Sequence, residues 1–424
     1  MSLGNRHGFG LALLVRRSMR QHLLSTIVTI ISTALASGLV LAVVSLDAQS
    51  RDAFTGGPVG FDAVLGARGS QLQLVLNTVF HLETSPGNLP WSMYQAIAAD
   101  PRVALAIPYA VGDNFRGYRI VGTTDDLFTK LELRPGEKLG FEAGHAFDPA
   151  KREAVVGSFA ARRTGLKLGS IFNPYHGVVY DESKKHDDEY VVTGILEPTN
   201  TPSDRVIWIP IDGLFRLSGH VLRGSGATYV PKAGEAIPDE AKEVSAVMLK
   251  FKAPQAGFLL DQTINKQGKV ATLAWPIGRV MAELFEKLGW VSGVLRLVAY
   301  LVAVVAAASI LASLHNSMSE RRRELAILRA IGARRRSVFA AIVLEAAATA
   351  AAGSVLGFVV YAAILGVARA IVRSETGVLL DPLYFHPVLL IAPIAMVALG
   401  TLAGVVPGLR AYRTEVAASL GAAE

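Results

Sequence analysis

Side chains that could bind a metal ion are concentrated in one stretch of the sequence. The candidates carry imidazole or carboxylate groups: His176, Asp181, His186, Asp187, Asp188 and Glu189. Both groups are common metal ligands, but the spacing here is not that of a recognised metal motif. A hydrophilic run of Asp, Lys and His between two apolar runs is more typical of a solvated turn. We therefore expect no metal site here, with metal binding as the alternative.

Motifs for catalysis and nucleotide binding are absent from the sequence. It contains no Gly-x-Ser-x-Gly, no His-Glu-x-x-His, no paired carboxylates at helical spacing that would argue for catalysis, and no Gly-x-x-x-x-Gly-Lys-Ser/Thr P-loop. It also contains no cysteine, which excludes disulfides, thiol chemistry and Cys-based zinc sites. We expect no catalytic residue and no cofactor bound by this chain, so any ATP must be hydrolysed by a partner.

The composition indicates a membrane protein. Of 424 residues, 51% are hydrophobic and only 18% are charged, whereas soluble domains carry about 25% charged residues. The net charge is +7, but the arginines cluster beside the apolar runs. That placement fits determinants of membrane topology better than a nucleic-acid surface, so no nucleic-acid partner is expected.

Four apolar segments are long enough to cross a bilayer, which requires roughly 20 helical residues. The expected spans are residues 23–46, 288–314, 338–368 and 385–409. A cleaved signal peptide is the alternative for the first, but its apolar part exceeds the usual length of about 7–15 residues. Gly353 and Gly357 form a small-xxx-small pair of the kind that allows close helix packing in lipid.

Arginines near the span ends predict the orientation, because cytoplasmic loops are enriched in Arg and Lys. One side of the membrane receives Arg6, Arg16, Arg17, Arg20, Arg321, Arg322, Arg323, Arg329, Arg334, Arg335, Arg336, Arg410 and Arg413. The loop on the other side, residues 369–384, has only Arg369 and Arg373. Both termini are therefore expected in the cytoplasm.

The remaining segments follow from this orientation. Residues 47–287 form one domain outside the cytoplasm, and residues 410–424 form a cytoplasmic tail. Residues 1–22 are expected to form an amphipathic segment at the inner surface, or alternatively to extend the first span.

The domain at 47–287 alternates short strand-like and helical runs, which favours an α/β or α+β fold. The expected strands are Ala154–Val156, Tyr190–Ile195, Val206–Ile209 and Val244–Phe251, and the expected helices are Trp91–Ala99, Ser158–Thr164 and Ile277–Leu288. Gly56–Gly69 is expected to be a glycine-rich linker. The predicted fold class is thus an α-helical integral membrane protein with four transmembrane helices and an α/β (α+β) extracytoplasmic domain inserted between the first two.

The cytoplasmic segment 315–337 combines arginines with an apolar stripe. Leu325, Leu328 and Ile331 recur every three residues, which places them on one helical face. Gly332 can end this helix, because glycine tolerates the left-handed conformation of a C-terminal cap. The pattern predicts a short amphipathic helix held between two spans, or alternatively a basic loop that only fixes topology.

This segment closely resembles the cytoplasmic segment of a known permease family. The sequence Glu320-Arg-Arg-Arg-Glu-Leu-Ala-Ile-Leu-Arg-Ala-Ile-Gly-Ala is similar to the pattern Glu-Arg-x-Arg-Glu-x-x-x-Leu-Arg-Ala-Ile-Gly-Ala of FtsX/MacB-like ABC transporter permeases, which include the lipoprotein-release permeases and the macrolide exporter. The stretches starting at Glu153, Gly165, Tyr190, Val206 and Pro407 also resemble this family.

The resemblance implies a permease of the bacterial inner membrane that dimerises, with an identical copy or a paralogue, and rests on a separate ABC ATPase. Membrane lipids and a periplasmic adaptor or lipoprotein are further implied partners. The implied function is mechanical: ATP hydrolysis moves the outer domain, which exports or extracts a lipoprotein, lipid, peptide or drug. The implied ATPase-coupling residues are Glu320, Arg323, Glu324, Leu325, Leu328, Arg329, Ala330 and Gly332.

Two alternatives to transport are open at this point. The same architecture could activate a cell-wall hydrolase or sensor without transport, or the chain could be a membrane anchor or metal-binding receptor. Arg296 and Glu345 lie near or within spans, where charges are expensive and often functional. Both are also within reach of a membrane interface, so paired structural roles are the alternative.

Overall fold

The computed structural model describes residues 13, 15–55, 60–224, 226–232, 234–320, 327, 329 and 333–413. Contacts divide the chain into two compact units. The helical unit takes its described residues from Met1–Ser50, Leu288–Arg369 and Asp381–Glu424, and the α/β unit from Arg51–Lys287 and Ala370–Leu380.

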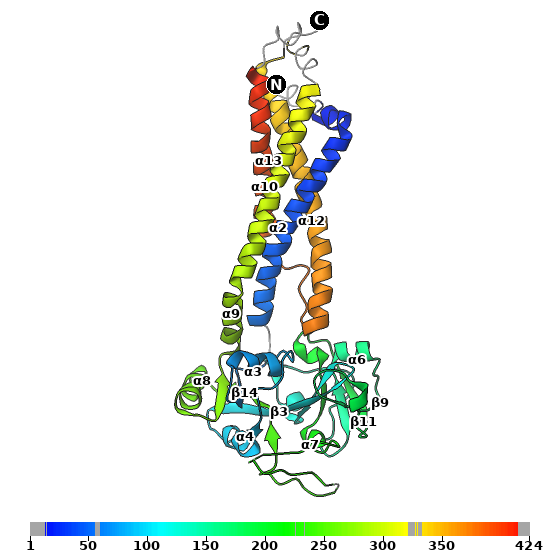
Figure 1. Ribbon diagram of the computed structural model, residues 1–424, viewed down its shortest axis with the longest axis vertical. Helices are drawn as coiled ribbons and strands as arrows, with labels where there is room; N and C mark the ends of the chain where they lie inside the picture. Colours follow the sequence, from blue (N-terminus) through cyan, green and yellow to red (C-terminus); the bar gives the residue numbers. More distant parts are fainter. Residues whose placement is uncertain are drawn as a thin grey trace. The chain divides into compact units, whose positions relative to one another are not determined.

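Four of the described helices are long and apolar enough to cross a membrane, which confirms the predicted spans. They are α2 (Leu23–Thr55), α10 (Gly289–Glu320), α12 (Arg335–Thr376) and α13 (Val388–Arg413). Figure 1 shows them running side by side. Each exceeds the length needed for a span, and their apolar residues are distributed around the helix as expected for segments that face both lipid and other helices.

Glycines bring α2 and α12 close together. A Cβ atom on Gly353 would lie 2.5 Å from the Cβ of Thr33, and one on Gly357 would lie 2.8 Å from the Cβ of Ser37. Both distances are shorter than real Cβ contacts, so no larger residue fits without displacing a helix. The small-xxx-small pair predicted from the sequence therefore lies in a helix interface, where close approach maximises dispersion contacts in lipid.

A second glycine series packs α13 against α12. Gly400, Gly404 and Gly408 are four residues apart and so share one helical face. Cβ atoms on the first two would lie 2.4 Å from the Cβ of Ala350 and 2.5 Å from that of Ala346. Small residues on both partners therefore set the spacing of these helices.

The α/β unit is built on one mixed sheet, which contains eleven strands among the described residues. The main strand order is β15-β1-β14-β3-β4-β12-β8-β11-β7, with β10 paired to β3 and β9 paired to β11. Most neighbours are antiparallel, but β12 with β4 and β11 with β8 are parallel. The strands in this sheet are β1 (Ala63–Ala67), β3 (Val103–Phe115), β4 (Tyr118–Thr123), β7 (Phe141–Gly144), β8 (Glu153–Val156), β9 (Ile171–Phe172), β10 (Tyr175–His176), β11 (Tyr190–Leu196), β12 (Ile207–Pro210), β14 (Ala246–Phe251) and β15 (Ala271–Ala274).

Two further pairs of strands lie apart from the main sheet, and helices and turns connect the rest. The pairs are β2 (Leu89–Pro90) with β13 (Glu243–Val244) and β5 (Glu132–Arg134) with β6 (Glu137–Lys138). The helices are α3 (Gln71–Thr78), α4 (Trp91–Ala98), α5 (Asp126–Thr129), α6 (Ser158–Thr164), α7 (Ile211–Phe215), α8 (Pro254–Asp261) and α9 (Ile277–Lys287), with single turns η1 (Glu182–Lys184), η2 (Pro202–Arg205) and η3 (Gln262–Gln267). The expected strands and helices of this domain are confirmed with ends shifted by a few residues, except that the expected strand Val244–Phe251 is divided between β13 and β14, which lie in different sheets.

The sheet separates two hydrophobic cores. Val64 and Leu65 of β1 are adjacent and point into different cores, because successive side chains of a strand face opposite sides. Trp208 is fully buried in the core that also contains residues of α3, α5 and α9. Residues of α4, α6, α7 and α8 contribute to the other core. Burial on both faces explains the nearly continuous apolar runs of these strands.

The prediction that Gly56–Gly69 is a linker is wrong for part of its length. Residues 56–59 lie outside the described part of the chain, but β1 (Ala63–Ala67) pairs with both β14 and β15 inside the sheet. Gly66 is needed there, because a Cβ atom would lie 2.3 Å from the Leu74 side chain. The glycines around and within this buried strand led to its prediction as a linker.

The last part of α12 belongs to the α/β unit, although residues 369–384 were expected to be a short loop. Residues Ala370–Leu380 are assigned to this unit by their contacts. The Arg373 guanidinium lies 5.7 Å from the centre of the Phe159 ring. Gly377 has a φ of 77°, and a Cβ there would lie 2.9 Å from the carbonyl oxygen of Thr201. α12 is thus one unbroken helix whose end is anchored against α6 and η2.

Candidate functional site

Most of the predicted ATPase-coupling residues lie outside the described residues: Arg323, Glu324, Leu325, Leu328, Ala330 and Gly332. Glu320 is described as the last residue of α10, and its carboxylate lies 3.0 Å from Nδ1 of His22. The Glu320 side chain is 66% exposed, so it is accessible to a partner. Arg329 is half-buried. The docking role of these residues stays a prediction.

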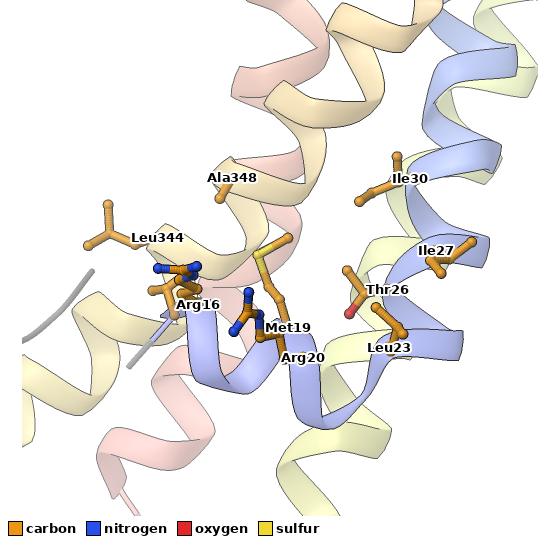
Figure 2. A pocket seen from close by; sticks show the side chains of 10 residues that line it. Arg16, Met19, Arg20, Leu23, Thr26, Ile27, Ile30, Leu344 and Ala348 are labelled. Carbon is orange, nitrogen blue, oxygen red and sulfur yellow. The ribbon is translucent and has the colours of Figure 1, made fainter. Parts of the chain in front are cut away.

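A groove with apolar walls lies beside the start of α2. It has a volume of about 570 Å³ and is lined by Val15, Arg16, Met19, Arg20, Leu23, Thr26, Ile27, Ile30, Leu344 and Ala348. Figure 2 shows Met19 and Arg20 between the side chains of α2 and those of Leu344 and Ala348 on α12. A turn at His22 separates the short helical stretch that carries Arg16 and Arg20 from α2. The expected position of this stretch at the inner membrane surface stays a prediction.

The two charges near or within the spans both have partners. The Ser18 hydroxyl donates a 2.6 Å hydrogen bond to Glu345, whose side chain is buried. The Arg296 guanidinium lies 3.8 Å from Asp47, which also accepts a 2.7 Å hydrogen bond from the Ser292 hydroxyl. These contacts favour paired structural roles, because a buried charge with a partner avoids most of the penalty of an isolated one.

The α/β unit brings together four side chains that are far apart in the sequence. Asp113 lies on β3, and His176 on β10 is directly opposite it in the antiparallel pair. His186 follows η1, with its backbone N–H bonded to the carbonyl of Pro174. His220 follows α7, in a turn closed by its backbone bond to Leu217. We call these four residues the histidine cluster.

The nitrogen atoms of the histidine cluster converge on one carboxylate oxygen. Oδ1 of Asp113 lies 3.2 Å from Nε2 of His186, 3.3 Å from Nδ1 of His176 and 3.3 Å from Nε2 of His220. Nδ1 of His176 and Nε2 of His220 are 3.1 Å apart. The four ligand atoms all lie within 4.8 Å of one another.

The histidine cluster is buried except at His176. The Asp113 side chain is fully buried, and those of His186 and His220 are 7% and 14% exposed, whereas that of His176 is 57% exposed. Burial alone would raise the pKa of Asp113, but hydrogen bonds from His186 and His220 outweigh it and hold the pKa at about 2. Burial is the largest single influence on His186 and would lower its pKa, but the hydrogen bond and charge of Asp113, the bond to the Ser218 carbonyl and the charge of Asp188 together raise the pKa. The carboxylate is therefore ionised at neutral pH.

Sequence reasoning identified only half of the histidine cluster. It selected His176 and His186 but missed Asp113 and His220, which no local spacing connects to them. The acidic neighbours have other roles: Asp188 contacts the Arg152 guanidinium at 2.7 Å and accepts a 2.8 Å hydrogen bond from the backbone of Ser218.

The other three acidic candidates do not belong to the cluster either. Asp181 accepts a bond from the backbone of Ser183 at the start of η1. Asp187 and Glu189 are exposed, because they alternate with buried residues in an extended segment.

Family comparisons match both parts of the chain. The model of the MacB-like periplasmic core domain matches residues 23–252, and the model of the FtsX-like permease C-terminal region matches residues 296–416. The first match alone covers more than half of the chain. The chain belongs to the FtsX/MacB-like permease family. This permease is accordingly a multi-pass membrane protein with the role of an ABC transporter permease, and members of its family are membrane components rather than enzymes.

Two solved structures resemble this permease in part. The periplasmic region of MacB from Actinobacillus actinomycetemcomitans is 10% identical, with 54% of this chain and 94% of that chain covered and a TM-score of 0.34. The extracellular domain of the noncanonic ABC-type transporter YknZ from Gram-positive bacteria is 14% identical, with 50% and 97% covered and a TM-score of 0.29. Comparison with curated proteins gave no match. Because these TM-scores are low, the family assignment rests on the two family models.

Proposed function

We propose that this permease couples ATP hydrolysis by a separate cytoplasmic ABC ATPase to movement of its α/β unit outside the bacterial inner membrane. The movement exports or extracts a substrate such as a lipoprotein, lipid, peptide or drug. The observation that supports this most directly is the position of the predicted coupling segment. α10 ends at Glu320 and α12 begins at Arg335, so a partner that binds the intervening chain displaces the ends of two long helices.

The continuity of α12 supports a mechanical role. Its residues run without a break from Arg335 to Thr376, its last turn places Arg373 over the Phe159 ring, and Gly377 directly after it lies close to Thr201 of the α/β unit. An α-helix rises 1.5 Å per residue with every backbone N–H bonded internally, so it moves as a rod along its axis. A displacement at Arg335 therefore reaches the α/β unit without passing through a flexible loop.

The remaining parts of the proposal follow from the family. The ATPase pairs with two permease copies, identical or paralogous, and both termini of this chain lie in the cytoplasm. Membrane lipids surround the helices, and Arg16 and Arg20 beside the apolar groove of Figure 2 suit contacts with anionic headgroups. A periplasmic adaptor or lipoprotein would complete the assembly.

The docking proposal is tested by substitutions on and beside the predicted apolar stripe. Leu328→Asp and Gly332→Val should abolish co-purification of an ABC ATPase from native membranes, because one places a charge on the predicted apolar stripe and the other alters the predicted end of the helix. Ile327→Asp is the matched control, because Ile327 lies outside the stripe and is 44% exposed. Membrane insertion should be unchanged in all three. The docking assignment fails if the ATPase still co-purifies with both stripe variants.

A further inference from the structure

We propose that Asp113, His176, His186 and His220 form a binding site for one divalent transition-metal ion, with Zn²⁺ the best-matched ion. This inference departs from the expectation that the segment around residues 176–189 is only a solvated turn. It concerns the α/β unit alone and does not depend on the coupling of this permease to an ATPase.

The distances in the histidine cluster match a tetrahedral site. Zn²⁺ binds His nitrogen and carboxylate oxygen at about 2.0–2.2 Å, so neighbouring ligand atoms of a tetrahedron are about 3.3–3.5 Å apart. Three nitrogens lie 3.2, 3.3 and 3.3 Å from Oδ1 of Asp113. The His176 and His220 nitrogens are 3.1 Å apart. The distances from the His186 nitrogen to the other two nitrogens are within 4.8 Å, so one ion reaches all four atoms once His186 moves closer to the other two histidines.

Hydrogen bonding around His186 orients it as a metal ligand. Its Nδ1 lies 2.8 Å from the carbonyl oxygen of Ser218, which can only accept, so Nδ1 carries a proton. Without a metal, Nε2 donates its proton to the Asp113 oxygen. A metal ion that displaces this proton leaves a lone pair on Nε2 in the same direction. A bond from the second ring nitrogen to a backbone carbonyl is the usual outer-shell support of a metal-binding histidine.

The Asp113 carboxylate provides a further observation in favour of a bound cation. Oδ2 of Asp113 is buried and has no hydrogen-bond partner among the described residues. Buried polar atoms are rarely left without a partner, because desolvation without a compensating bond is costly. A bound cation would neutralise the buried carboxylate and would remove the repulsion between the lone pairs of three neutral imidazoles and the Asp113 oxygen.

The neighbouring residues hold the ligands in place. The Asn173 side-chain amide donates to the backbone carbonyls of His186 and Asp188, at 3.2 and 3.0 Å. Asp188 in turn binds the backbone of Ser218, which supports the turn that carries His220. Three ligands are thus buried and fixed, whereas the exposed His176 leaves a path through which an ion can enter or leave.

The donor set selects the class of metal. Three imidazoles and one carboxylate suit Zn²⁺ and neighbouring late first-row ions, whereas Ca²⁺ and Mg²⁺ prefer sites made of oxygen. Cu²⁺ and Ni²⁺ can compete by affinity, so geometry and availability decide which ion is bound. Zn²⁺ and Co²⁺ are therefore suitable probes, because Co²⁺ replaces Zn²⁺ in tetrahedral sites and gives a visible absorption spectrum.

The test uses the full chain in detergent, purified through a tag without histidines and stripped with a chelator. We expect the wild type to retain one Zn²⁺ per chain after dialysis and to show tetrahedral Co²⁺ absorption. His176→Ala should weaken Zn²⁺ binding at least about tenfold, and Asp113→Asn or His186→Ala should abolish it. His145→Ala is the matched control, because His145 is exposed in the same unit and outside the cluster.

The wild type alone can overturn the proposal, so the test does not depend on whether the buried variants fold. Retention of less than a fifth of an equivalent of Zn²⁺, or the absence of Co²⁺ absorption, contradicts the site. Equal losses in His176→Ala and His145→Ala also contradict it. The His176 variant should fold normally, because this side chain is 57% exposed, and its unfolding temperature without metal checks this.

Discussion

At the scale of single residues, the interfaces between the long helices depend on the absence of side chains. Gly353 of α12 faces Thr33 of α2 at a distance that excludes a Cβ atom, whereas a Cβ atom on Gly366 of the same helix would meet nothing within 4 Å. The two glycines therefore have different effects on the structure, although they lie in the same helix. The first allows close packing, and the second only adds backbone entropy to the unfolded chain.

This contrast predicts the effect of two matched substitutions. Gly353→Leu should lower the thermal stability of the chain in detergent by about 1–3 kcal/mol or prevent close packing of α2, because overpacking forces the helices apart. Gly366→Leu should be neutral or slightly stabilising, since leucine is the better helix former. Thermal unfolding followed by circular dichroism measures both. Equal destabilisation by the two would show that α2 and α12 are not packed at Gly353.

A buried histidine predicts a dependence of stability on pH. Burial, together with Arg119 and Arg205, lowers the pKa of His81 to about 3. The ring is therefore neutral in the folded chain, whereas in the unfolded chain it binds a proton below its ordinary pKa of about 6.5. The free energy of unfolding is therefore undiminished by His81 above pH 6.5. It decreases progressively as the pH falls toward 3, by about 2 kcal/mol between pH 6.5 and 5, because only the unfolded chain binds the proton.

His81→Asn should therefore flatten the fall in unfolding temperature between pH 7.5 and pH 5. Asparagine suits the site, because His81 has a φ of 55° and Asn tolerates the left-handed region. His145→Asn, at an exposed site, should leave the slope of the wild type unchanged. The interpretation is wrong if wild type and His81→Asn lose the same stability over this range.

At the scale of elements, the long helices were predictable and the histidine cluster was not. A span must supply about 20 apolar residues, so its signal lies in one continuous stretch of sequence. The strands around Val155 and Ile209 were likewise visible as short apolar runs. β1 was missed because Gly66 and the glycines around the strand are typical of a linker. The reason for Gly66 is the facing Leu74 side chain, which the sequence alone does not reveal.

The histidine cluster was not predicted from the sequence, for a different reason. Asp113 and His220 lie on elements that meet His176 and His186 only through the pairing of β10 with β3 and the turn after α7. The spacing of residues along the sequence does not predict which strands and turns meet in space. The acidic residues beside His186 attracted attention in the sequence, but an extended segment turns Asp187 and Glu189 to solvent.

The unbroken α12 predicts that a kink within it uncouples the ATPase from the α/β unit. Val367→Pro removes one internal hydrogen bond and bends the helix, at a local cost of about 3 kcal/mol. Val367 is 62% exposed, so Val367→Ala is a mild control at the same site. Spin labels attached at Lys266→Cys in two permease copies should show an ATP-dependent distance change that Val367→Ala keeps and Val367→Pro loses. An unchanged response in Val367→Pro would mean that α12 does not transmit the movement.

At the scale of the whole molecule, the order of elements defines how the two units are connected. The α/β unit is inserted between α2 and α10, and Ala370–Leu380 adds a further connection from the end of α12. Three long helices therefore lead to the α/β unit along the chain, whereas the predicted coupling segment joins the opposite ends of α10 and α12. With α10 and α12 as membrane spans, this order of elements predicts that the coupling segment and the α/β unit lie on opposite sides of the membrane.

That requirement can be tested directly, because the chain contains no cysteine and each introduced cysteine is a unique label site. Lys266→Cys in the α/β unit and Ser319→Cys near the end of α10 both replace exposed residues. A membrane-impermeant maleimide should label Lys266→Cys in intact spheroplasts, and Ser319→Cys only after the membrane is opened with detergent. Labelling of Ser319→Cys in intact spheroplasts would place the coupling segment outside the cell, where no ATPase could bind it. The arginines beside this segment make the opposite result the expected one, since positive residues are retained in the cytoplasm.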